Sequence, residues 1–343
     1  MTPFDPNAAA QPDSGVFGLP FTPEEAKVVL LPVPFEATTS YGGGTADGPE
    51  QILQASRQVD LFDLDTGRPY EVGISMLPHP ENVRAWNDEA KALAAPIVES
   101  GGLDVDEAAL AKVNALSEKM NDWVYQTAKK WMAEGKIVGL VGGDHSTPFG
   151  CIKAHAEKYP NLGVLHLDAH ADLRDAYEGF TWSHASIMFN VMKHLPGVRK
   201  LVQVGIRDFG EAEYTMIRES DGRIHTFFDA RLARARLDGM PWREQVDAIV
   251  NELPQHVYLS WDIDGLEPTL CPDTGTPVPG GLTFAQAVAL LEGVVRAGKK
   301  IVGFDLNEVS DGGGGNEWNA NVGSRLLYKM IGWTLVSQGL LKT

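Results

Sequence analysis

The sequence is short of cysteine, and this scarcity excludes two classes of protein. Its 343 residues contain two cysteines, Cys151 and Cys271, which lie far apart and do not form a CxxC pair. A disulfide scaffold and a thiolate zinc site are therefore not indicated. Any metal ion would have to be bound by histidine and carboxylate side chains.

Basic residues and long apolar runs are also scarce. The chain has 29 Lys and Arg against 46 Asp and Glu, a formal net charge of −17. Because like charges repel, binding to nucleic acid or to an anionic membrane surface is not expected, whereas a cationic substrate is compatible. No apolar run reaches the roughly 18 residues of a membrane span, and residues 1–15 lack the basic start and apolar stretch of a secretory signal. We expect a cytoplasmic protein.

Strand-like segments alternate with helix-like segments over most of the chain. The predicted strands are 27–35, 136–141, 162–167, 200–206, 256–261 and 300–306. Two amphipathic helices are predicted within 84–135, with a break at 99–102, and another helix over 284–298. Near-continuous apolar strands separated by helices are typical of a parallel sheet covered on both faces. We predict this α/β fold, preceded by an irregular arm over residues 1–26 that lies on the body or on a partner subunit.

Four of the predicted strands run directly into polar clusters. These clusters are GGDHS (142–146), DAHAD (168–172), DIDGLEP (262–268) and NEVSD (307–311). Ligands of open α/β sheets bind beyond the carboxyl ends of the strands. We therefore expect the four clusters to meet in one crevice.

Three of these clusters together supply aspartate and histidine side chains in a pattern that indicates metal binding. In DAHAD the polar side chains occupy alternate positions, which face the same way if the segment is extended. DIDG repeats the alternation, and GGDHS adds a histidine. Four carboxylates and two imidazoles cannot be buried together without compensating positive charge. The six candidate metal ligands are His145, Asp168, His170, Asp172, Asp262 and Asp264.

Six ligands are too many for one tetrahedral site but suit two metal ions bridged by carboxylates. Oxygen and imidazole ligands without sulfur favour Mn, Fe, Ni or Zn over Cu. A binuclear centre turns water into a nucleophile for an sp² carbon, so the expected reaction is hydrolysis. A solvated loop or a helix cap would explain one DxHxD segment alone, but not three clusters together.

Two further residues are candidates for catalysis. His184 follows the DAHAD segment and offers an imidazole that can carry a proton to the leaving group. Glu308 ends the last predicted strand, where a free carboxylate could pair with a planar guanidinium; a solvated acid or a helix cap is the alternative. His166 lies inside a predicted strand, either as a hydrogen-bond donor near the metal or as a core residue, and we favour the core.

Six motifs stand in a fixed order along the chain: GGDHS, DAHADLRDAYEG, SHAS, SWDIDGLEP, TGTPVPGGLT and DLNEV. In this order they resemble the ureohydrolase family, which includes arginase, agmatinase and guanidinobutyrase. The resemblance covers about residues 27–335. It implies one domain over 27–343 with a three-layer α/β/α fold, a mainly parallel eight-stranded sheet, and assembly into homo-oligomers, usually trimers or hexamers. It also implies hydrolysis of a guanidino group to urea and an amine by two Mn ions or, in some members, Ni ions.

The resemblance assigns a role to each candidate residue. The implied ligands are His145, Asp168, Asp172 and Asp262 for one metal, and His170, Asp168, Asp262 and Asp264 for the other. Asp168 and Asp262 would then bridge the two metals. Asp172 would also accept a hydrogen bond from the attacking hydroxide. His184 corresponds to the proton shuttle of the family, and Glu308 to the acid that positions the guanidinium.

The choice of substrate depends on segments outside the metal motifs. The segment 173–184 differs from the Asn/Ser-rich loop with which arginase recognises the amino-acid end of arginine, and it is similar to agmatinases. The arm, the helical region around 84–120 and the loop 312–318 resemble a longer branch that includes hydrolases of guanidine and small substituted guanidines. We rank a small guanidine ahead of agmatine, and agmatine ahead of 4-guanidinobutyrate, whose negative charge the net acidity disfavours.

Several alternatives are left open by the sequence. Tyr177, Phe180 and Trp182 either line the substrate pocket or pack in the core. The helices within 84–135 either cover the sheet or form an oligomer interface. Two other classes of function are a deacetylase, which generally lacks the second aspartate pair, and a subunit of a hetero-oligomeric ureohydrolase with an assembly or regulatory role.

Overall fold

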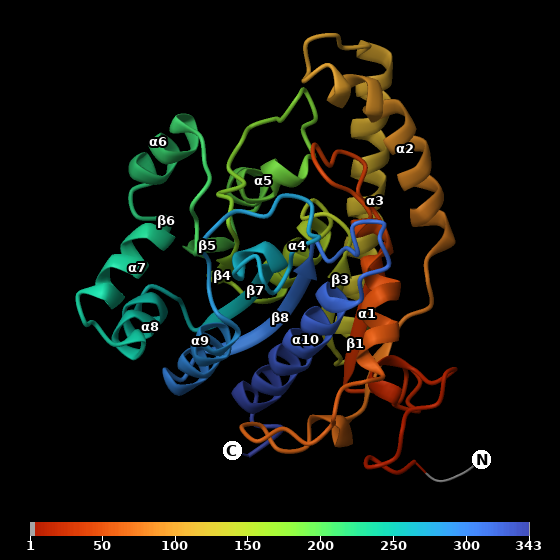
Figure 1. Ribbon diagram of the computed structural model, residues 1–343, viewed down its shortest axis with the longest axis vertical. Coiled ribbons are helices and arrows are strands. Elements are labelled where there is room, and N and C mark those ends of the chain that lie inside the picture. The colour runs from red at the N-terminus through yellow and green to blue at the C-terminus, as the bar shows by residue number, and fades with distance from the viewer. Residues whose placement is uncertain (1–3, 343) are drawn as a thin grey trace.

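The computed structural model describes residues 4–342, and over these residues the chain forms an eight-stranded sheet in which every strand pair is parallel (Figure 1). The strands are β1 (Val28–Val33), β2 (Ile74–Met76), β3 (Ile137–Gly142), β4 (Leu162–Leu167), β5 (Val198–Val204), β6 (Ile224–Phe227), β7 (His256–Asp262) and β8 (Lys300–Asn307). Their order is β2-β1-β3-β8-β7-β4-β5-β6. The predicted α/β class is therefore confirmed.

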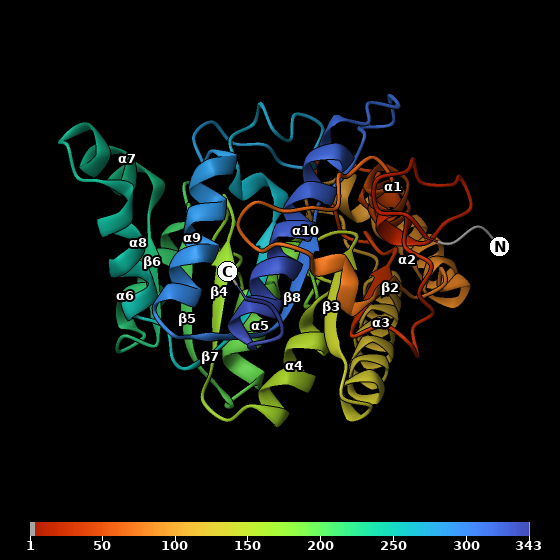
Figure 2. The ribbon, with the colours of Figure 1, turned by 90° about the horizontal axis from the view of Figure 1, so that it is seen from below.

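Helices lie on both faces of the sheet (Figure 2). They are α1 (Gly48–Ser56), α2 (Glu81–Glu99), α3 (Glu107–Ala133), α4 (Phe149–Lys158), α5 (Ile187–His194), α6 (Glu211–Glu219), α7 (Asp229–Leu237), α8 (Trp242–Asn251), α9 (Phe284–Arg296) and α10 (Trp318–Ser337). One core packs beneath α1 and α8–α10, and the other beneath α2–α5. Within residues 4–342, no helix combines the length and the apolar character needed to cross a membrane.

The central strands are buried on both sides, as their apolar runs predict. Along β1, Val28 and Leu30 belong to one core, whereas Val29 and Leu31 belong to the other. Alternate residues of a strand face opposite sides, so a strand between two helical layers needs apolar residues at every position. The two strands that the sequence pattern missed, β2 and β6, have only three and four residues and lie at the two edges of the sheet.

The two predicted amphipathic helices are α2 and α3. The first ends at Glu99, at the predicted break, and the second begins after it, at Glu107. The carboxylate of Asp106 caps α3 by accepting hydrogen bonds from the backbone N–H groups of Ala108 and Ala109. Met120 and Val124 of α3 are fully buried in the core beneath it. The pair therefore covers one face of the sheet.

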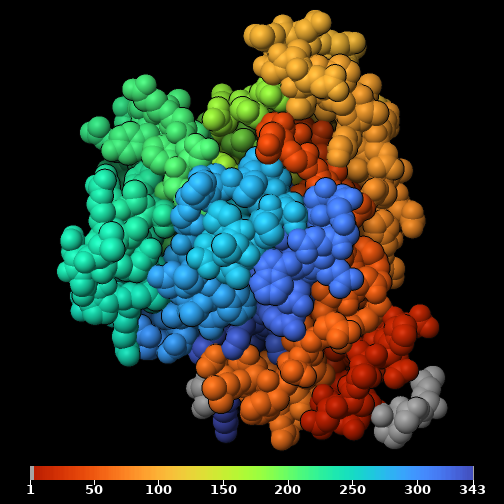
Figure 3. Space-filling model, in the orientation of Figure 1, coloured from red at the N-terminus to blue at the C-terminus, as the bar shows by residue number. Residues whose placement is uncertain are grey.

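The described part of the N-terminal arm, residues 4–26, lies on the body of the protein. Phe17 is 2% exposed, its ring lies 4.9 Å from that of Tyr328 on α10, and its N–H donates to Ser56 Oγ of α1 at 2.8 Å. Figure 3 shows the early residues, in red, on the surface at the lower right of the molecule. Residues 1–3 of the predicted arm, and Thr343, lie outside the described residues.

Candidate metal centre

The four polar clusters follow β3, β4, β7 and β8, which are the four central strands of the sheet. Because these strands are parallel, their carboxyl ends share one edge, and the clusters meet there as predicted. His145, after β3, places Nδ1 3.0 Å from Asp168 Oδ2 and 3.5 Å from both Asp172 Oδ2 and Asp262 Oδ2. Three carboxylates from two neighbouring strand ends thus surround one imidazole nitrogen.

A second group of ligand atoms lies beside the first and shares Asp168 with it. His170 Nδ1 is 3.4 Å from Asp168 Oδ1 and 3.1 Å from Asp264 Oδ2. The two oxygens of Asp168 therefore face different histidines. Together the two groups bring all six predicted ligands into one cluster, with Asp168 common to both groups.

Backbone N–H groups fix the orientation of the shared and neighbouring carboxylates. Asp168 Oδ1 accepts from the N–H of His170 at 2.6 Å, Asp262 Oδ1 from that of Asp264 at 2.8 Å, and Asp264 Oδ1 from that of Ala169 at 3.0 Å. For Asp262 and Asp264, the other oxygen faces a histidine nitrogen. The carboxylates are therefore held in place before any ligand binds.

The prediction that DAHAD is extended is wrong in detail. β4 ends at Leu167, before the first aspartate of the motif. Asp172 has a φ of 55°, in the left-handed region that side chains other than glycine rarely adopt. The side chains of DAHAD converge because the chain turns there, and not because a strand continues. Glu308, with a φ of 64°, is similarly constrained.

The charge balance of the cluster fits a pair of divalent cations. Asp172 and Asp262 are only 5% and 4% exposed. Burial, together with the charge of nearby aspartates, raises the pKa of both carboxyl groups well above the usual range. Burial opposes protonation of His145, but hydrogen bonds to Asp168 and Asp262 outweigh it and raise its pKa. This excess of buried negative charge, with imidazole and oxygen donors, is suited to divalent metal ions.

Two residues that the sequence analysis did not select orient His145. Its Nε2 lies 3.0 Å from Ser260 Oγ, which in turn donates to Asp305 Oδ1 at 3.0 Å. The single hydroxyl proton of Ser260 is used by that bond, so Ser260 accepts the Nε2–H of His145. The Nδ1 atom then faces the carboxylates, where it could bind a metal ion. Ser260 stands two positions before Asp262 on the same strand, and that spacing could have drawn attention to it.

A cavity of about 180 Å³ opens beside this cluster. Its lining includes His170, Asp172 and His184, as well as Arg174, Tyr177 and Asp208. Burial and the neighbouring His170 lower the pKa of His184 to about 4. Its imidazole is therefore neutral at pH 7 and able to accept a proton.

Glu308 is buried and is not among the residues that line the cavity. It is 4% exposed, and its Oε1 accepts a hydrogen bond from the backbone N–H of His145 at 2.9 Å. Its Oε2 is buried and has no hydrogen-bond partner within residues 4–342. Gly275 lies directly beside Oε2, because a Cβ built on Gly275 would be 3.4 Å from it. Glu308 thus combines an unused acceptor with a neighbour that has no side chain.

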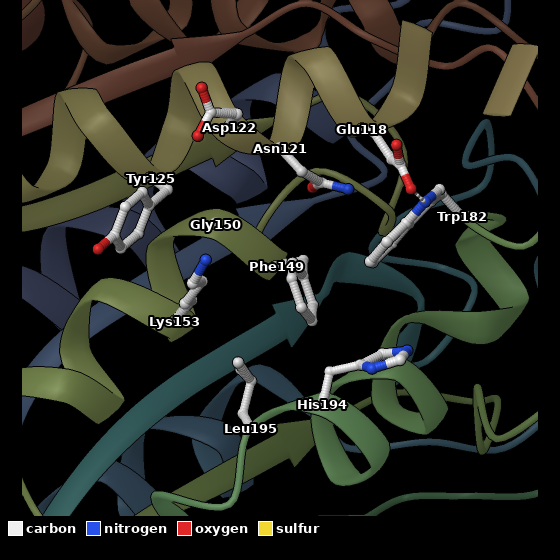
Figure 4. A pocket seen from close by; sticks show the side chains of 10 residues that line it. All are labelled: Glu118, Asn121, Asp122, Tyr125, Phe149, Gly150, Lys153, Trp182, His194 and Leu195. Carbon is white, nitrogen blue, oxygen red and sulfur yellow. Dashed lines mark hydrogen bonds between the residues drawn. The ribbon is translucent and has the colours of Figure 1, made fainter. Parts of the chain in front are cut away.

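The three aromatic residues after DAHAD have three different positions. Tyr177 lines the cavity, whereas Phe180 is fully buried in the core. Trp182 points into a separate hollow of about 310 Å³ between α3, α4 and α5, where its ring lies 4.8 Å from that of Phe149 (Figure 4). Its Nε1–H donates to Glu118 at 3.4 Å. Of the three, only Tyr177 lines the cavity beside the metal cluster.

Comparisons with known proteins find similar sequences and structures. A model of the Arginase family matches residues 26–332. The N(1)-aminopropylagmatine ureohydrolase of Thermus thermophilus is 35% identical over 321 residues, which cover 92% of this chain and 94% of that protein. The agmatinase of Pyrococcus horikoshii is 29% identical over 314 residues, which cover 90% of this chain and 92% of that protein. The structure of proclavaminate amidino hydrolase from Streptomyces clavuligerus has a TM-score of 0.71 at 23% identity and covers 95% of this chain and 98% of its own.

Proposed function

The chain belongs to the arginase family, and on that premise we propose that it hydrolyses guanidine, or a small substituted guanidine, to urea and ammonia or an amine. It is a ureohydrolase, a metal-dependent enzyme that cleaves C–N bonds of guanidino compounds. The size of the cavity supports a small substrate. At about 180 Å³ it is smaller than typical ligand pockets, which have volumes of roughly 300–1,000 Å³.

A longer cationic substrate is the second candidate. The relatives act on agmatine or on N(1)-aminopropylagmatine, according to their names. Asp208, an exposed carboxylate in the cavity wall, is suited to a terminal ammonium group. The same acidity disfavours the carboxylate of 4-guanidinobutyrate. Agmatine-type compounds therefore rank second and 4-guanidinobutyrate third.

We infer that two divalent ions, Mn or Ni, are the cofactors. The proposed ligands are His145, Asp168, Asp172 and Asp262 for one ion, and His170, Asp168, Asp262 and Asp264 for the other. When bound, such a pair supplies a nucleophile from water at neutral pH and stabilises developing negative charge. The excess of buried carboxylates in the cluster, which raises the pKa of Asp172 and Asp262, supports this inference.

The residues of the chain bind and orient the substrate and move its proton. In this proposal the Oε2 atom of Glu308, which has no partner among the described residues, accepts N–H groups of the guanidinium. Asp172, which lines the cavity, accepts a hydrogen bond from the attacking water and orients it. The neutral imidazole of His184 takes up a proton and transfers it to the departing nitrogen.

We also propose a cytoplasmic homo-oligomer, a trimer or a hexamer, in which residues 27–343 form one catalytic domain preceded by an arm over residues 1–26. The contacts of Phe17 with α1 and α10 support the packing of the described part of the arm on this domain. Light scattering of the purified chain measures the assembly. A hetero-oligomer is the alternative, and it predicts that the lone chain binds metal but needs a second subunit for activity.

Urea release by the purified chain tests the function. Separate preparations loaded with Mn and with Ni would be given guanidine, methylguanidine, biguanides, agmatine, N(1)-aminopropylagmatine, 4-guanidinobutyrate and arginine. We expect the highest kcat/KM for guanidine or methylguanidine. A higher value for an agmatine-type compound would replace the small-substrate proposal and leave the reaction class intact. No urea from any compound, with two metals bound per chain, would contradict the proposal that this chain alone is a small-guanidine hydrolase.

A further inference from the structure

Two histidines compete for the same oxygen of the shared carboxylate. Asp168 Oδ2 lies 3.0 Å from His145 Nδ1 and 2.8 Å from His166 Nε2. By distance alone both are candidate metal ligands, because the ligand atoms of His145, His166, Asp168 and Asp172 all lie within 4.8 Å of one another. The sequence analysis favoured core packing for His166, and the contact with Asp168 contradicts that choice.

A row of polar side chains crosses three neighbouring strands and ends at His166. Gln203 of β5 is the register partner of His166 on β4, and Thr226 of β6 is the register partner of Gln203. Gln203 Nε2 lies 3.0 Å from His166 Nδ1 and 2.7 Å from the carbonyl oxygen of Ala171. Thr226 Oγ1 donates to Gln203 Oε1 at 2.8 Å. His166 and Gln203 are fully buried, and Thr226 is 8% exposed.

The donors and acceptors of this row allow one arrangement. A backbone carbonyl only accepts hydrogen bonds, so the atom of Gln203 that faces Ala171 is the amide nitrogen. Its two hydrogens are then directed at Ala171 and at Nδ1 of His166. The Nδ1 atom is therefore the acceptor, and the proton of the neutral imidazole is on Nε2. At the other end, the Thr226 hydroxyl holds the amide in this orientation.

We propose that Thr226 and Gln203 fix His166 as a hydrogen-bond donor to Asp168, so that His166 positions the carboxylate shared by the two metal sites and does not bind metal itself. Asp168 Oδ2 accepts from His166, and Oδ1 accepts from the backbone of His170. Each oxygen keeps one lone pair for a metal. His145 is instead a proposed metal ligand, because its Nε2–H donates to Ser260 and its Nδ1 atom faces the carboxylates.

The expected effect on metal affinity rests on the binuclear centre proposed above, whereas the position of the proton on His166 does not depend on that centre. The proton position is measured by nitrogen-15 NMR of the full chain labelled at its 9 histidines and loaded with diamagnetic zinc. The His166 signals are identified by their loss in His166→Phe. We expect a proton on Nε2 in the parent chain. A proton on Nδ1 there would overturn the proposal.

Gln203→Glu gives a sharper test, because it preserves shape and replaces the donor facing His166 with an acceptor. We expect it to move the His166 proton to Nδ1, or to add a second proton. We also expect His166→Phe and Gln203→Glu to weaken binding of at least one Mn ion by roughly 10- to 100-fold in calorimetric titrations, as is usual for partners of metal ligands. Thr226→Val should weaken it less, in the same direction.

Thr334→Val is the matched control. The Thr334 hydroxyl is fully buried and donates to Met330 within α10 at 2.7 Å, remote from the metal cluster. We expect parental Mn affinity from this variant. Parental Mn affinity in both His166→Phe and Gln203→Glu would overturn the proposal, as would an equal loss in Thr334→Val. Neither readout uses a substrate, so the outcome is independent of which guanidino compound is hydrolysed.

Discussion

Glu308 accepts a hydrogen bond from the backbone N–H of His145 at 2.9 Å, which ties the ends of β8 and β3 together. The bond uses Oε1 and leaves Oε2 buried, without a hydrogen-bond partner in the described part of the chain. Burial and the charges of Asp262 and Asp144 raise the pKa of Glu308 well above its usual range. A cation that met Oε2 would restore the charged form, and a guanidinium has the N–H groups to do so.

Glu308→Gln should therefore weaken substrate binding without loss of metal. The amide oxygen can still accept from His145, but an amide nitrogen in place of Oε2 would repel the guanidinium. Hydrogen bonds to charged groups contribute about 1.5–3 kcal/mol, so we expect KM to rise roughly 10- to 100-fold. Steady-state kinetics and metal analysis of the variant check this. Unchanged kinetics would remove the role assigned to Glu308.

Asp168→Ala and Asp262→Ala should each abolish binding of the metal pair, because each removes a proposed bridging ligand. Metal analysis after dialysis should find fewer than two ions per chain in either variant. Asp175→Ala is a suitable control, since Asp175 follows the same motif but has a side chain that is 75% exposed and paired with Lys193. Full metal occupancy in Asp168→Ala or Asp262→Ala would contradict the ligand assignment.

His184→Asn should retain both metals and lose most of the turnover. Its imidazole lines the cavity and is not among the ligand groups of the cluster. Proton transfer by a positioned side chain contributes about 10²- to 10⁴-fold, and we expect kcat to fall by that factor. Metal content and urea release measured on the same preparation check this. A parallel loss of metal would show instead that His184 supports the ligand cluster.

The pair formed by Asp63 and Lys329 should make stability depend on pH. Lys329 Nζ lies 2.7 Å from Asp63 Oδ2, and Asp63 Oδ1 accepts a hydrogen bond from the backbone N–H of Thr66. Burial opposes ionisation of Asp63, but these hydrogen bonds lower its pKa below the usual value. A lowered pKa stabilises the fold above the unfolded-state value of about 3.9, and this stabilisation is lost as the pH falls through the lowered folded-state pKa.

Asp63→Asn should therefore lower the free energy of unfolding at pH 7 by about 1–3 kcal/mol, with a smaller difference near pH 3. Urea denaturation at the two pH values measures it. The exposed pair of Asp247 and Arg296 provides the control, because Asp247→Asn should cost under about 1 kcal/mol at either pH. A pH-independent effect of Asp63→Asn would contradict the role of the carboxylate charge.

Much of the fold follows from local pattern. A strand between two helical layers needs apolar residues on both faces, and the six longer strands have that pattern. β2 and β6 lack this apolar pattern because short edge strands need few apolar residues. The cluster of histidine and aspartate side chains was also predictable, because parallel strands bring their carboxyl ends to one edge and three motifs carry these residues there.

The partners of these residues depend on how distant segments pack together. The sequence placed His166 beside the ligands, but its task depends on Gln203 and Thr226 of two other strands. The sequence also grouped Tyr177 with Trp182, but in the structure these two residues line different cavities. Local sequence is enough to predict which chemical groups reach the site, because the strand pattern and the residue types that follow each strand are local properties. Their hydrogen-bond directions were decided by the fold, because the donors and acceptors come from distant parts of the chain.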